Sequence, residues 1–224
     1  MYLRDIIYSI TGHKIIPVDT QNNTIHYDIV TYLKQSLDNI QKNMIFYAKR
    51  PNDVSNNTCD DQCLEKAIVE EFNKVSSNLQ ARWLAGSGYP DIEIVDLSTK
   101  KPIGYVEVKA TARQNMHSPR DFYVSPGKVI SVTSTRSSGG NIQFNIVVSP
   151  RLTHYKIRED APHIMVLVKI YQLRDCKLPK NMSYECKCWK VQKFSLHDLY
   201  SLRLKTKIEF NIDYHGIITN CPQL

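Results

Sequence analysis

Charged and apolar side chains alternate along "GYPDIEIVDLSTKKPIGYVEVKAT", residues 88–111. This alternation predicts two β-strands, "PDIEIVDL" and "PIGYVEVKA", which the turn "STKK" joins into a hairpin. Successive side chains of a strand point to opposite faces. Glu107 and Lys109 therefore share one face of the second strand, and Val106 and Val108 share the other.

The turn brings another carboxylate to the charged face. Folding the hairpin about residues 99–100 places Asp91 opposite Val108, next to Glu107 and Lys109. Two carboxylates in this position suit Mg²⁺, which takes one or two protein carboxylates and keeps several waters. With Lys109 beside a metal-bound water, the group would supply a Lewis acid, a positioned nucleophile and positive charge. Phosphodiester hydrolysis needs these three parts.

The segment before this hairpin predicts a helix over roughly residues 62–79. Its apolar side chains recur at steps of three and four residues and form one stripe: Leu64, Ile68, Phe72, Val75 and Leu79. Glu71 falls beside this stripe, whereas Glu70 projects almost opposite to it. We expect Glu71 to reach the carboxylate cluster, the alternative being that it extends to solvent.

A second copy of the Asp…Glu-x-Lys pattern occurs in Asp175, Glu185 and Lys187. Here the Asp ends an apolar strand, no Pro precedes it, and the carboxylates would flank an exposed hairpin tip. No helix that bears a Glu leads into this copy. The first copy is therefore the better candidate, although the repeat shows that the bare spacing has little specificity.

The elements around the hairpin predict a single domain over residues 1–224. An amphipathic helix is expected over 28–48, further strands in "VISVTS", "IQFNIVV", "HIMVLVKIYQL" and "CKCWKVQKF", and a short helix in "SLHDLYSLR". The catalytic core would cover about residues 60–175, with an N-terminal helical part and C-terminal strand and helix elements appended. This order predicts an α/β fold, a mixed β-sheet flanked by helices, and not a doubly wound parallel sheet.

The charge balance favours a polyanionic partner. Lys and Arg number 29 against 22 acidic residues, a net charge of +7, which attracts nucleic acid at long range but is weak evidence alone. No apolar run approaches the roughly eighteen residues that span a bilayer. The N-terminal stretch "MYLRDIIYSITGHK" lacks the basic region and cleavage site of an export signal. We therefore expect a cytoplasmic protein without a membrane partner.

The cysteines are expected to be free thiols, because no export signal is present. They are Cys59, Cys63, Cys176, Cys186, Cys188 and Cys221. The last four could instead bind zinc, but the usual two-plus-two spacing is missing and no His completes a finger.

The helix with Glu71, the entry "GSGYPD" and the strand end "VEVKAT" resemble the PD-(D/E)xK nuclease superfamily, most closely type II restriction endonucleases. The resemblance covers residues 60–112 and rests on sparse motifs. Pro90-Asp91 matches the PD element, Glu107-Val108-Lys109 matches the (D/E)xK element, and Glu71 matches the acidic residue of the preceding helix.

The resemblance implies a restriction-endonuclease-like core and a Mg²⁺ ion, with Mn²⁺ as a substitute. Asp91, Glu107 and the Val108 carbonyl would hold the ion, and Lys109 would orient or deprotonate the attacking water. It also implies cleavage of double-stranded DNA that leaves 5′-phosphate ends, a homodimer, and a bacterial or archaeal host.

The polar segment after Lys109 would lie beside bound DNA. Side chains in it that could read base edges or hold phosphates are Arg113, Gln114, Asn115, His117, Arg120, Lys128, Arg136 and Asn141. The alternative is a solvated loop.

Four functions remain open from the sequence. The first is a site-specific Mg²⁺-dependent DNA endonuclease of a restriction system, which the long polar segment favours. The second is a repair, recombination or transposition nuclease of the same superfamily. The third is an inactive DNA-binding protein of the same fold, against which the intact trio Asp91, Glu107 and Lys109 counts. The fourth is a basic protein with no nucleic-acid role.

Overall fold

The computed structural model describes residues 2–51, 53–56, 63–85, 89–112, 130–136, 142–148, 155–180, 182–202, 204–205 and 215–216. Its helices are α1 (Leu3–Thr11), α2 (Thr24–Asn43), α3 (Asp53–Asn56), α4 (Leu64–Val75) and the 3₁₀ turn η3 (Leu199–Ser201). Its longer strands are β3 (Leu79–Trp83), β4 (Ile92–Asp96), β5 (Pro102–Thr111), β6 (Ile130–Arg136), β7 (Ile142–Val148), β8 (Ala161–Gln172) and β9 (Lys187–Asp198). The short strands are β1 (Ile15–Ile16), β2 (Phe46–Ala48), β10 (Leu204–Lys205) and β11 (His215–Gly216).

The main sheet is mixed, as predicted. Its order is β2-β9-β8-β5-β4-β3, and β1 pairs with β8 beside this path. Strand β8 runs parallel to β5 and β1, whereas the other neighbours in the path are antiparallel. The predicted α/β class is thus confirmed, and a restriction-endonuclease-like core remains a prediction. No helix among the described residues is both long and apolar enough to cross a membrane.

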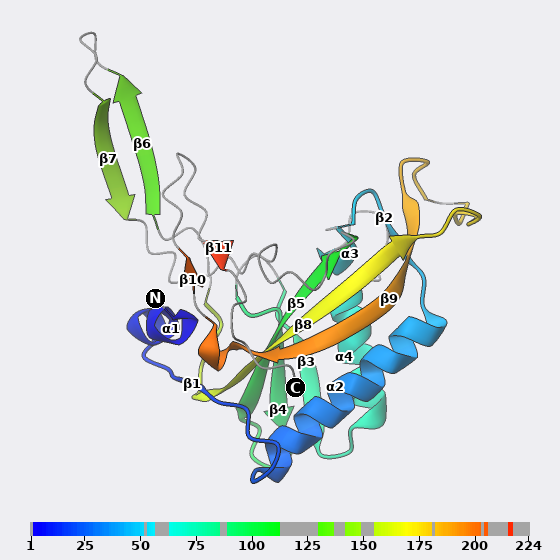
Figure 1. The fold of residues 1–224 in the computed structure, drawn as a ribbon. Helices are drawn as coiled ribbons and strands as arrows, with labels where there is room; N and C mark the ends of the chain where they lie inside the picture. Colours follow the sequence, from blue (N-terminus) through cyan, green and yellow to red (C-terminus); the bar gives the residue numbers. More distant parts are fainter. Residues whose placement is uncertain are drawn as a thin grey trace.

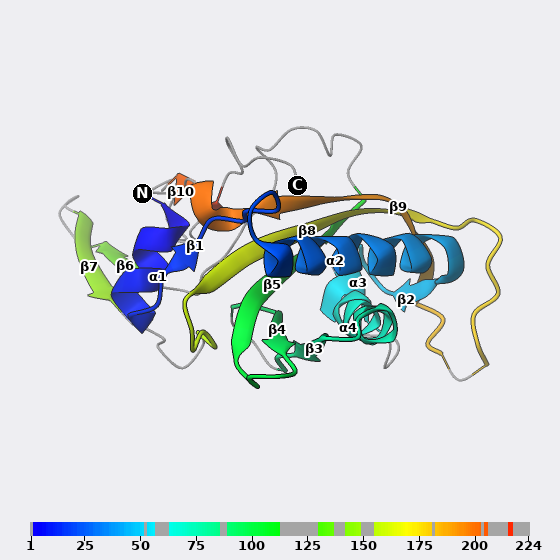
Figure 2. The ribbon, with the colours of Figure 1, turned by 90° about the horizontal axis from the view of Figure 1, so that it is seen from below.

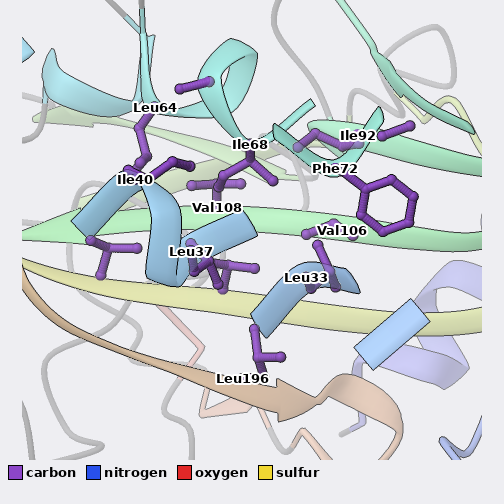
Figure 3. Close-up of a cluster of buried hydrophobic side chains, with 14 of the residues drawn as sticks. Leu33, Leu37, Ile40, Leu64, Ile68, Phe72, Ile92, Val106, Val108 and Leu196 are labelled. Carbon is purple, nitrogen blue, oxygen red and sulfur yellow. The ribbon is translucent and has the colours of Figure 1, made fainter. Parts of the chain in front are cut away.

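Helices α2 and α4 pack on one face of this sheet (Figures 1 and 2). Figure 3 shows their buried side chains beside the inward-facing residues of the strands. Those drawn and labelled are Leu33, Leu37, Ile40, Leu64, Ile68, Phe72, Ile92, Val106, Val108 and Leu196. The valines of β5 belong to this core, which confirms the predicted alternation of that strand.

A second apolar cluster includes Tyr105, between Val106 and Gly104 in β5. It also contains Tyr89, Met165, Leu167 and residues of α1 and η3. Alternating residues of β5 and β8 thus enter different clusters, so side chains such as Glu107 are directed away from the α2–α4 core.

Three predicted helices differ from the observed elements. The helix expected over residues 62–79 is α4, which ends at Val75, and Leu79, expected on its apolar stripe, begins strand β3 instead. Helix α2 ends at Asn43, and Phe46 to Ala48 form the edge strand β2 against β9 instead of a last helical turn. Both Phe46 and Ala48 are buried by this pairing, so tertiary contacts override the helical spacing. In the predicted C-terminal helix, residues up to Asp198 still pair with β8, and only η3 turns.

The expectation of free thiols is wrong for the connection between β8 and β9. Cys176 and Cys188 form a disulfide with Cα atoms 6.2 Å apart, and Cys186 is also disulfide-bonded. The main chain supports the first bridge, because Leu173 N–H donates to the Cys188 carbonyl at 2.9 Å. Cys63 is a buried free thiol, whereas Cys59 and Cys221 lie outside the described residues.

Replacing both Cys176 and Cys188 with serine is expected to lower the free energy of unfolding by about 3 kcal/mol, because the bridge restricts the unfolded chain. The two cysteines are twelve positions apart along the chain. Urea denaturation of the wild type and the double variant measures the difference, which should vanish when both are reduced. Equal stability without reductant would contradict this bridge.

Candidate active site

Asp91 is anchored to β5 by both its main chain and its carboxylate. Its N–H donates to the Val106 carbonyl at 3.1 Å, and its carbonyl accepts from Leu84 N–H at 2.8 Å. The Val108 N–H donates to Asp91 Oδ2 at 2.7 Å. The carboxylate therefore lies beside the middle of β5, next to Glu107.

The pairing register differs by one residue from the predicted one. Ile92 pairs with Val106, whereas folding about residues 99–100 would have paired it with Glu107. The hairpin loop is centred one residue earlier than predicted, with Asp96 N–H donating to the Lys101 carbonyl at 3.0 Å. Near the loop this shifts the pairing partners by two residues, and a register irregularity between Ile94 and Val95 reduces the shift to one residue at Ile92. Asp91 still reaches the predicted neighbours.

Glu107 and Lys109 form an ion pair in which the ammonium donates to Glu107 Oε1. The other carboxylate oxygen, Glu107 Oε2, is buried and has no hydrogen-bond partner among the described residues. Burial raises the pKa of Glu107 to about 8; the Lys109 ammonium opposes this rise, and the Asp91 carboxylate adds to it. Burial alone would lower the pKa of Lys109, but the carboxylates of Glu107 and Asp91 outweigh burial and raise it.

The helix carboxylate that acts on this group is Glu65, which is not among the residues predicted from the sequence. Glu65 lies in the first turn of α4 and accepts a hydrogen bond from Trp83 Nε1 at 2.8 Å. Burial raises the pKa of Glu65 to about 7, and the next cause is the Asp91 carboxylate. The Lys109 ammonium lowers it. Glu65 is therefore near enough to Asp91 and Lys109 to affect them electrostatically.

Glu71, the residue expected in this role, lies elsewhere on α4. Its carboxylate pairs with Lys74 at 2.5 Å and accepts a hydrogen bond from Asn39 of α2 at 3.3 Å. Glu65 and Glu71 are six positions apart, or about 120° around a helix, so they flank opposite edges of the apolar stripe. Glu65 is three and seven residues from Ile68 and Phe72, but Glu71 has the same spacing to Ile68 and Leu64, so the sequence held no signal that favoured Glu65.

Lys156 adds a second cation near Glu65. Its ammonium donates to the carbonyls of Leu84 and Ala85 at 2.8 and 2.7 Å, at the end of β3. It also lowers the pKa of Glu65, against the raising effect of burial. Two lysines thus accompany three carboxylates at this end of the hairpin.

The donor set suits a hard divalent cation held by few protein ligands. Mg²⁺ commonly takes one or two carboxylates and keeps its remaining waters. Asp91 and Glu107 offer two carboxylates on adjoining strands, and Glu107 Oε2 is a buried oxygen in need of a partner. In the described part of the chain, no group of three or more Asp, Glu, His or Cys side chains forms a metal site by itself. Two carboxylates, one of them with a buried oxygen that has no partner among the described residues, fit an ion that keeps part of its water shell.

The second Asp…Glu-x-Lys copy is placed at the surface. Glu185 pairs with Lys49, and both side chains are about half exposed. Most of the expected DNA-contacting residues, namely Arg113, Gln114, Asn115, His117, Arg120, Lys128 and Asn141, lie outside the described residues. Arg136 is the last residue of β6 and pairs with Ile142 of β7.

Comparison with known families identifies the chain. A model of the type II restriction enzyme MjaV family matches residues 1–137, a region that contains Glu65, Asp91, Glu107 and Lys109. Searches of curated proteins and of solved structures gave no match. The matched region is more than half of the 224 residues. The chain therefore belongs to the MjaV family of type II restriction enzymes.

Proposed function

We propose that this restriction enzyme hydrolyses phosphodiester bonds at a specific site in double-stranded DNA, with Mg²⁺ as cofactor, and leaves 5′-phosphate ends. One observation carries the proposal. The Val108 N–H donates to the Asp91 carboxylate, so this carboxylate lies beside the strand that presents the Glu107–Lys109 pair. The family match favours restriction over repair or recombination.

The chain's own residues have distinct parts in this proposal. Asp91, Glu107 and the Val108 carbonyl would hold the cofactor, which when bound supplies Lewis acidity and positive charge. Lys109 would orient the attacking water or take its proton, and its charge would balance the negative charge that develops on the phosphate. Glu65 would support the site from α4 through its electrostatic interaction with Asp91 and Lys109.

The β6–β7 hairpin supports a role in contacting DNA. It forms a separate two-stranded antiparallel sheet, and Figure 1 shows it standing away from the main sheet. A two-stranded ribbon fits the major groove of B-DNA. We propose that this hairpin, with Arg136 at its end, and the polar residues on either side of it contact the duplex. We also propose a homodimer, which analytical ultracentrifugation would test.

The direct test is to incubate the protein with a long, sequenced, unmethylated DNA and Mg²⁺, beside a matched reaction containing EDTA. We expect discrete fragments in the reaction without EDTA and none in the reaction with it, and ligation and sequencing of the fragment ends should show 5′-phosphates. A smear of fragments would support hydrolysis but indicate a structure-specific or nonspecific nuclease. Intact DNA with Mg²⁺ and also with Mn²⁺, across several DNAs, would refute the proposal.

A further inference from the structure

Tyr89, directly before Pro90-Asp91, is fixed through its side chain. Its ring is 1% exposed. Its hydroxyl lies 2.7 Å from His163 Nδ1 in the only hydrogen bond found for that hydroxyl among the described residues. The two rings also stack, with centroids 5.5 Å apart and planes 26° from parallel. The residue two positions before Asp91 is therefore held by a directional contact as well as by packing.

His163 connects this contact to the strand that carries the other site residues. It lies on β8, where it pairs in register with Tyr105, and Met165 pairs with Glu107. The Tyr105 ring meets His163 edge-on, with centroids 4.9 Å apart. His163 is fully buried, and burial lowers its pKa to about 3, so the imidazole is neutral at neutral pH. The enclosed, neutral imidazole therefore offers the Tyr89 hydroxyl a hydrogen-bond partner whose position is fixed.

The main chain on both sides of Pro90 is also fixed. The Tyr89 carbonyl accepts from Lys156 N–H at 3.0 Å, and Tyr89 forms an isolated parallel bridge with Tyr155. On the other side, Asp91 N–H binds the Val106 carbonyl. The short link between these anchors sets the direction from which the Asp91 carboxylate meets the Val108 N–H.

We propose that Tyr89 is a positioning residue, which through its hydrogen bond to His163 holds Asp91 in line with Glu107. The proposal rests on the proposed nuclease function for its catalytic consequence, but the placement of Asp91 can be tested without DNA or metal. Displacing a catalytic group by about 1 Å can cost a hundredfold in rate. Loss of one remote anchor should therefore cost about tenfold or more.

Tyr89→Phe removes the hydroxyl and keeps the buried ring. The matched control is Tyr105→Phe, because Tyr105 is equally buried in the same cluster and its hydroxyl accepts from Arg158 N–H at 2.9 Å. Tyr105→Phe also loses a second hydrogen bond, from Glu159 N–H at 3.3 Å, so a purely structural effect of losing the hydroxyl should appear in both variants. The assays are run below the melting temperatures of both variants.

The first readout is hydrogen exchange of the Val108 amide, which donates to Asp91. We expect exchange at least tenfold faster in Tyr89→Phe and unchanged in Tyr105→Phe. The second readout is single-turnover cleavage at saturating Mg²⁺. The rate should fall about tenfold or more in Tyr89→Phe alone, while the affinity for DNA measured without Mg²⁺ stays the same.

Substitutions of His163 provide the rescue test. The amide of His163→Asn lies where Nδ1 lay and can still bind the Tyr89 hydroxyl, whereas His163→Leu cannot. The first should retain the cleavage rate and the second should lose it. Unchanged Val108 exchange in Tyr89→Phe would overturn the positioning role, whatever the DNA shows. Faster exchange, with intact DNA from the wild type, would leave the positioning role in place and refute the nuclease function.

Discussion

Replacing Lys109 with alanine is expected to slow DNA cleavage by about a thousandfold, because the cation nearest the Asp91–Glu107 pair is lost. Mutation of one preorganised group that stabilises a developing charge typically has this effect. The measurement is single-turnover cleavage of a linear DNA that contains the target site, at saturating Mg²⁺. The affinity of the variant for the same DNA should change far less than the rate.

The control for this change lies just before the same strand. Lys101 is exposed and pairs with Glu159 at 3.9 Å, so Lys101→Ala also removes one positive charge from the hairpin. Its cleavage rate should stay within about twofold of the wild type, since exposed ion pairs contribute little. Equal losses in both variants would mean that Lys109 acts only through the net charge. Full activity of Lys109→Ala would exclude it from the reaction.

The part of the site within the hairpin could be predicted from sequence because it depends on local rules. The two-residue repeat of β5 decides which face Glu107 occupies, and the turn decides which residue it meets. An error of one residue in the turn moved the partner of Ile92 from Glu107 to Val106. The predicted grouping of Asp91 with Glu107 and Lys109 still holds, because the Asp91 side chain itself reaches the strand and accepts a hydrogen bond from Val108 N–H.

Features that depend on contacts between distant segments could not be predicted from the sequence. The residues of β2 fit the spacing of the preceding helix, and only their pairing with Trp189 and its neighbours makes them a strand. The disulfide of Cys176 and Cys188 likewise follows from the way β8 and β9 return to each other. Spacing alone could not choose between Glu65 and Glu71, because both flank the apolar stripe of α4. The choice depends on how α4 lies against β3.

Glu65→Gln is therefore expected to lower the cleavage rate by ten- to a hundredfold, as is typical for residues that support a metal site from its surroundings. The substitution removes the negative charge that Glu65 carries above its pKa of about 7, and it keeps an oxygen that can accept from Trp83 Nε1. Because the shape of the side chain is preserved, the effect should come from the electrostatics of the site. Single-turnover cleavage is again the measurement, with Mg²⁺ titrated to separate weaker metal binding from slower chemistry.

Glu71→Gln is the matched control, since it makes the same chemical change on the same helix. Glu71 is as buried as Glu65, but its partners are Lys74 and Asn39, away from Asp91. Its rate should stay within about twofold of the wild type. A loss confined to Glu71→Gln would reverse the assignment and require α4 to present its other edge to the site. Because the two positions differ by about 120° around the helix, both cannot face Asp91 in one orientation of α4.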